Sequence, residues 1–86
     1  MKTANKLMDL DNFAGDAALY ELGVPIKGHK HVVVSAVRLL NRSETFIFPA
    51  NERGVVIDWF PLPGSIIDVY DHRMALEDAG YVLLDA

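Results

Sequence analysis

The sequence predicts an α+β fold: an antiparallel meander of three or four strands, a short C-terminal helix packed on one face, and a short last strand. Three observations predict this. Apolar, β-branched runs separated by turn residues fill the middle of the chain from Lys30 to Phe60. A capped helical segment follows at 72–79, and a further apolar run follows at 81–84. The 86 residues suffice for a single domain, 1–86, in which residues 1–16 are a candidate for a loosely attached N-terminal segment.

The N-terminal third has the weakest pattern. Residues 1–16 mix polar residues with a few apolar ones at a spacing typical of a short amphipathic helix: Leu7, Met8, Leu10 and Phe13. Residues 17–22 fit a helix or a strand. Because they precede a Gly/Pro-rich link and the long middle strand, a strand paired with that middle strand is the preferred interpretation. Whether residues 1–22 form helix or strand stays open at this point.

The middle of the chain predicts three consecutive strands. Residues 30–40 contain neither Gly nor Pro and are apolar on both faces, which indicates a central strand covered on both sides. The polar residues 41–44 predict a turn. Residues 45–50 predict the second strand, and Pro49 indicates that it ends there or runs along an edge, since proline cannot donate to a ladder.

A sharper turn is predicted at Asn51–Gly54, where glycine can take the left-handed conformation that closes a hairpin. Residues 55–60 predict a third strand with Val55, Ile57 and Trp59 on one face. That alternation favours Trp59 as a core residue over Trp59 as an exposed interface anchor. The Pro- and Gly-rich residues 61–64 end the strand.

The C-terminal helix is the clearest local prediction. Asp71 is a suitable N-cap, and Gly80 is a suitable C-terminal stop. One face of the helix carries His72, Ala75, Leu76 and Ala79, and the opposite side sends Arg73, Glu77 and Asp78 into water. A helix this short depends on packing against the sheet.

Composition limits the classes of function. The chain is 51% hydrophobic and has no cysteine, so excess apolar surface on a thin core favours a partner chain or a second copy over a well-packed monomer. The net charge is −4, and residues 58–86 carry six acids against one arginine. Direct binding of nucleic acid is therefore not expected. The acidic end either meets a basic protein surface or serves as a solvated face. A cytoplasmic location, no membrane span and no cofactor are expected.

Histidines supply the candidate chemistry. His29 and His31 project from one face of a strand that begins by residue 29, a spacing that can bind Zn²⁺ if His72 completes the site. Alternatively, His72 is a general acid or base oriented by Asp71 or Asp68, with Ser65 as the available nucleophile, although no glycine-framed elbow surrounds that serine. The plain interpretations are two half-exposed histidines at a strand entrance and a histidine packed in the first turn of a helix.

A resemblance covers a little over half of the chain. The segments that carry it are Val33–Val37, Glu44–Ala50, Gly54–Trp59, Leu62–Ser65 and Asp71–Tyr81. Together they resemble a pattern in small uncharacterised bacterial and phage-borne proteins. The resemblance implies a small accessory protein and transfers no functional residue.

These observations favour a non-catalytic protein-interaction module, acting as a homodimer, by docking on a larger protein, or as an accessory or inhibitory protein of a mobile element. The predicted binding surface consists of Phe60, Ile66, Ile67, Tyr70, Arg73, Glu77 and Asp78. The alternative is a small metal-dependent or hydrolase-like protein that uses His29, His31 and His72.

Overall fold

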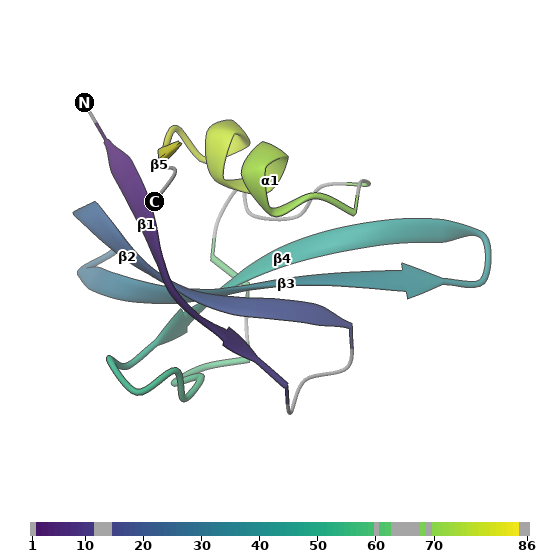
Figure 1. The fold of residues 1–86 in the computed structure, drawn as a ribbon, viewed down its shortest axis with the longest axis horizontal. Coiled ribbons are helices and arrows are strands. Elements are labelled where there is room, and N and C mark those ends of the chain that lie inside the picture. Colours follow the sequence, from purple (N-terminus) through teal and green to yellow (C-terminus); the bar gives the residue numbers. More distant parts are fainter. Residues whose placement is uncertain (1, 12–14, 60, 63–67, 69, 85–86) are drawn as a thin grey trace.

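The protein is built on one five-stranded sheet with the strand order β4-β3-β2-β1-β5 (Figure 1). The computed structural model describes residues 2–11, 15–59, 61–62, 68 and 70–84, without the side chain of Leu39. Strands β1 to β4 form an antiparallel meander, whereas β5 pairs with β1 in parallel. The predicted α+β class is confirmed, with a mixed sheet. The elements are β1 (Thr3–Leu10), β2 (Asp16–Ile26), β3 (His29–Leu39), β4 (Arg42–Ala50), α1 (His72–Asp78) and β5 (Val82–Leu84).

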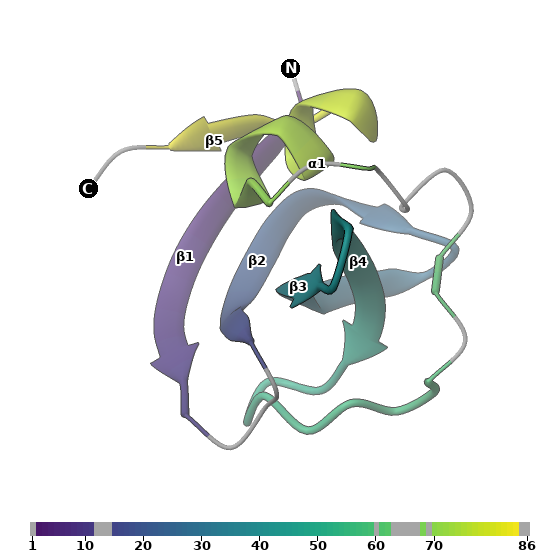
Figure 2. The same cartoon turned by 90° about the vertical axis from the view of Figure 1, so that its right-hand side faces the viewer.

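Both faces of the curled sheet are covered (Figure 2). We name the two faces after the elements that cover them, the helix face and the loop face. The helix face carries Tyr20, Val34 and Ile47, which pack with Leu76 of α1. The loop face carries Leu19, Val33 and Ala50, which pack with Val56 from the segment that follows β4. Two small cores, one on each face, therefore replace a single thick one.

The N-terminal segment corrects the amphipathic-helix prediction. Residues 3–10 form β1, which lies between β2 and β5 in the sheet. Ala4 is fully buried opposite Leu22, so pairing on both sides fixes a segment whose own pattern is weak. The strand predicted at residues 17–22 is confirmed as part of β2, paired with β3.

A β-bulge in β1 explains the misleading spacing of its apolar residues. Lys6 pairs with Tyr20, but the next pair joins Met8 to Leu19, so β1 contains one extra residue, Leu7. Lys6 and Asp9 therefore share the helix face, and Leu7 and Met8 between them share the loop face.

The strands predicted in the middle are confirmed for β3 and β4. The turn between them comprises only residues 40–41, so the predicted turn at 41–44 was too long and Arg42 already belongs to β4. Pro49 lies in an edge strand, as predicted. The β2–β3 hairpin closes on Lys27 and Gly28, both with positive φ, which suits the right-handed twist of the strands.

The third predicted strand, residues 55–60, is wrong. The turn before it is as expected: Gly54 has a φ of 84°, and the Asn51 side chain accepts from the backbone N–H groups of Arg53 and Val55. Beyond it, one isolated bridge joins Ala50 to Val56. Ile57 donates to the Pro49 carbonyl at 2.9 Å, but Pro49 has no N–H with which to continue the ladder. Phe60 lies outside the described residues.

The C-terminal helix and last strand are confirmed. The Asp71 carboxylate accepts from the Met74 N–H at 3.2 Å, and Gly80 ends the helix with a φ of 95°. Ala75 and Leu76 are buried, as the helical pattern predicted. No helix among the described residues is long and apolar enough to cross a membrane.

Gly15 precedes β2 and tests how tightly this strand packs. Its φ is 91°, and an added Cβ would lie 2.3 Å from the Ala36 carbonyl oxygen. Gly15→Ala should therefore lower the free energy of unfolding by about 2–4 kcal/mol, from backbone strain plus overpacking. Gly28 also has positive φ but has open space around it, so Gly28→Ala should cost only about 1–2 kcal/mol. Urea titration of both variants measures the difference, and equal losses would contradict the close approach at Gly15.

Candidate functional site

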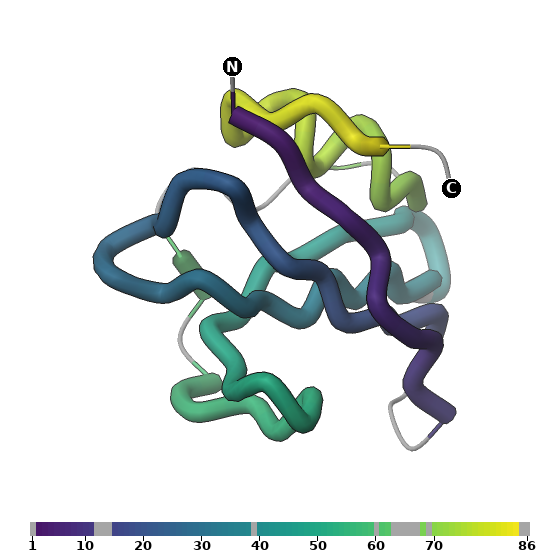
Figure 3. Tube along the Cα trace, turned by 60° about the vertical axis from the view of Figure 1, so that its left-hand side comes forward, coloured from purple at the N-terminus to yellow at the C-terminus, as the bar shows by residue number. Residues whose placement is uncertain are grey.

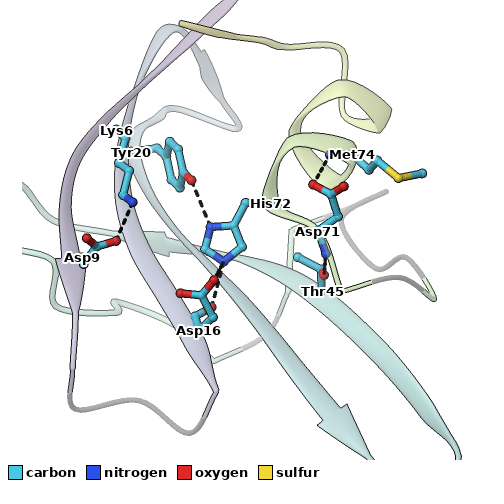
Figure 4. Close-up of polar contacts among 8 residues, drawn as sticks. All are labelled: Lys6, Asp9, Asp16, Tyr20, Thr45, Asp71, His72 and Met74. Atoms are coloured by element: carbon cyan, nitrogen blue, oxygen red, sulfur yellow. Dashed lines mark hydrogen bonds and ion pairs between the residues drawn. The ribbon is translucent and has the colours of Figure 1, made fainter. Parts of the chain in front are cut away.

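His72 lies at the centre of a polar cluster on the helix face (Figure 4). It is the first residue of α1, and its side chain reaches β2. Its Nδ1 is 3.0 Å from the Tyr20 hydroxyl, and its Nε2 is 2.8 Å from the Asp16 carbonyl oxygen. The Asp16 carboxylate lies 3.7 Å from the same Nε2. One imidazole thus joins the start of the helix to two positions of one strand.

The protonation of Tyr20 assigns the hydrogens in this cluster. Burial, reinforced by the Asp16 carboxylate, raises the pKa of Tyr20 to about 12. The phenol therefore keeps its proton and can donate to Nδ1, and Nε2–H donates to the Asp16 carbonyl oxygen, which can only accept. A raised pKa disfavours Tyr20 as a nucleophile, which needs the opposite shift. The arrangement suits a structural tie between α1 and β2.

The acid–base hypothesis named different partners for His72. Asp71 does not orient the imidazole: its carboxylate caps α1, and its backbone N–H donates to the Thr45 hydroxyl at 3.1 Å. Asp16 is the partner, and no spacing in the sequence signals this contact because the two residues are 56 positions apart. Ser65, the proposed nucleophile, lies outside the described residues.

The three histidines do not converge. His31 contacts Glu21 at 3.6 Å, and Glu21 is its direct neighbour on β2. His72 contacts Asp16, which lies five residues before Glu21 on the same strand. These two positions of β2 are about 16 Å apart. Within the described part of the chain, no group of three or more His, Cys, Asp or Glu side chains could hold a metal ion.

A second candidate site lies at the outer edge of β4. Val55, Ile57 and Trp59 are exposed to solvent, so the expectation that Trp59 belongs to the core is wrong. Their exposed fractions are 59%, 59% and 63%, whereas Val56 between them packs inward on the loop face. We call this set, Val55, Ile57 and Trp59, the Trp59 strip.

Aromatic contacts fix the position of Trp59. Its ring meets Phe48 edge-on at 5.2 Å, and Phe48 stacks against Phe46 at 5.9 Å. Edge-on and offset-stacked pairs are the favoured aromatic geometries. Pro49 and Pro61 flank this stretch, and they were the sequence signal that it could not ladder like an ordinary strand.

The predicted binding surface is described only in part by the structure. Arg73, Glu77 and Asp78 are exposed on α1, and Tyr70 lies 4.5 Å from the Arg38 guanidinium that covers its ring. Phe60, Ile66 and Ile67 lie outside the described residues. Helix α1 and the segment after β4 lie on opposite sides of the sheet (Figure 3), so the acidic helix and the Trp59 strip are separate surfaces.

No protein family model, curated protein or solved structure matches the chain.

The tie at His72 predicts a pH dependence. Tyr20→Phe removes the donor to Nδ1 and should lower the free energy of unfolding by about 1 kcal/mol at neutral pH. In the wild type, the raised pKa of Tyr20 means that the folded state holds this proton more tightly than the unfolded state. The stabilisation of the folded state by the protonated Tyr20 is therefore complete below pH 10. As the pH rises from 10 towards 12, the free energy of unfolding falls by up to about 1.4 kcal/mol per pH unit.

Urea titrations from pH 8 to pH 12 should therefore show a shallower loss of stability for the Phe variant than for the wild type. The Phe variant should still lose some stability over this pH range, because burial also raises the pKa of Tyr81. Parallel pH profiles for the two proteins would contradict the assignment of Tyr20 as the buried donor.

Proposed function

We propose that the protein is a small, non-catalytic protein-interaction module that binds a partner protein through the Trp59 strip. The observation that carries the proposal is the exposure of three large apolar side chains within residues 55–59, each more than half exposed. Exposed apolar groups gathered at one place are typical of docking surfaces, and tryptophan is a frequent energetic anchor in them.

The backbone beneath the strip supports a binding role. Asn51 donates to the Val55 carbonyl at 3.0 Å, and Ile57 donates to the Pro49 carbonyl at 2.9 Å. These bonds hold the segment against β4 before any partner arrives. A site that is already ordered loses less conformational entropy on binding.

The metal-dependent or hydrolase-like alternative has less support. His29 and His31 lie in β3 opposite Ile26 and Glu21 of β2, whereas His72 contacts Tyr20 and Asp16. Among the described residues, the hydroxyl that contacts His72 is that of Tyr20, which is only 2% exposed, so a substrate has little access to it.

Two further elements belong to the proposal. The acidic side of α1, with Glu77 and Asp78, supports a basic patch as a second contact on the partner. The resemblance over residues 44–81 supports an accessory or inhibitory role in a mobile element, acting in the cytoplasm. Under this proposal the partner is a protein, because a net charge of −4 opposes binding to nucleic acid phosphates.

Capture from a lysate of the native host tests the proposal. The probes are the immobilised wild type and the double variant Ile57→Ser/Trp59→Ser, and a partner of the strip should be retained at least about tenfold less by the variant. The substitutions should cost the isolated fold at most about 1–2 kcal/mol, chiefly through the lost contact with Phe48.

The matched control is Val24→Ser/Leu40→Ser, which removes two exposed apolar side chains from other parts of the surface. It should retain the partner at the wild-type level. Equal retention by all three proteins, or equal loss in both variants, would contradict a specific role of the Trp59 strip.

A further inference from the structure

The two outer edges of the sheet are treated differently. Along β4, the carbonyls of Ile47 and Pro49 accept from Leu62 and Ile57, so the following segment occupies the Ile47–Ala50 end of that edge. Along β1, strand β5 pairs only with Thr3–Asn5. No strand of the described chain pairs with the outer side of β1 from Lys6 to Leu10. An unpaired edge of this kind is a template for another strand.

The bulge sorts the side chains of this open edge into two sets. Lys6 and Asp9 lie on the helix face and form an ion pair of 2.6 Å. Leu7 and Met8 lie on the loop face, exposed by 43% and 44%. Along this edge the side chains are therefore positive at Lys6, apolar at Leu7 and Met8, and negative at Asp9.

We propose that the β1 edges of two copies of this chain pair antiparallel across a two-fold axis between Leu7 and Met8. In this register Lys6 lies opposite Asp9 of the second copy, and Leu7 lies opposite its Met8. The same contacts recur on both sides of the axis, as an isologous interface requires. Opposite charges and apolar groups in directly facing positions stabilise antiparallel pairs.

Charge complementarity selects both the occupant and the register. An exposed lysine on an edge strand ordinarily blocks pairing, because a second copy would bring another lysine to face it. Here a register centred on Lys6 does face lysine with lysine, and one centred on Asp9 faces aspartate with aspartate. The axis between Leu7 and Met8 instead gives each Lys6 an acidic neighbour.

The neighbouring strand limits the pairing. The outer side of Asn5 is already taken by Leu84 of β5, so the new ladder runs from Lys6 to Asp9 on each copy. This inference rests on the proposed function, because a second copy of the chain is one protein partner of an interaction module. The dimer nevertheless uses a different surface from the Trp59 strip. The two proposals can therefore fail separately.

A charge-swap mixing experiment tests the dimer by sedimentation velocity. The variants are Lys6→Asp and Asp9→Lys, each at exposed positions, with folding checked by circular dichroism. Each variant alone faces like charges at both pairs, so its dimer should dissociate about tenfold more readily than the wild-type dimer. An equimolar mixture restores opposite charges at both pairs and should recover a heterodimer.

Ile57→Ser/Trp59→Ser is the control and should sediment as the wild type does. A wild-type protein that stays monomeric at its highest soluble concentration would overturn the proposal. So would single variants that dimerise as well as the wild type, or a mixture that associates no better than its components. Loss of the dimer in the control variant would transfer the interface to the Trp59 strip and would also overturn it.

Discussion

Both faces of the β2–β3 strand pair are apolar, and the rest of the chain is arranged to cover them. Leu19 and Val33 are fully buried on the loop face, and Val32 and Val34 are fully buried on the helix face. An 86-residue chain without cysteine has little material for two layers. It uses a helix of seven residues on one side and an irregular segment on the other. Burial at the centre of the sheet is the constraint from which the remaining features follow.

Covering the loop face with an irregular segment has a consequence for the surface. The segment after β4 turns one side chain, Val56, inward to fill the small second core. Its neighbours on both sides, Val55 and Ile57, are exposed. Trp59 gains partial support from Phe48 but keeps most of its surface in water. The exposed strip is thus a result of how the second face is closed, and it is the feature that gives the molecule a docking surface.

Local signals in the sequence were sufficient for much of the fold. The β-branched run of β3, the Asn51–Gly54 turn and the capped helix at Asp71 each carry their own physical cause, and each is found in the structure. Elements that depend on distant neighbours were not predictable in this way. Strand β1 depends on pairing with β2 and β5, and the third strand fails because Pro49 cannot donate to it.

The candidate sites also combine features that have a local signal in the sequence with features that depend on distant neighbours. His72 was identified as a potential reactive residue, but its partners Tyr20 and Asp16 become neighbours only when α1 packs on the sheet. Alternation predicted a core position for Trp59, and the structure exposes this residue instead. A local pattern could not reveal this, because it depends on Val56 being the residue of the segment that packs against the second core.

The most direct test of this account is collisional quenching of tryptophan fluorescence in the dilute, isolated protein, since Trp59 is the single tryptophan of the chain. The free and the urea-unfolded protein are each titrated with iodide and acrylamide. An outward-facing Trp59 predicts strong quenching of the folded protein by both agents, approaching that of the unfolded chain. Folded protein with protected, blue-shifted emission would place Trp59 in a core and would contradict the Trp59 strip as the docking surface.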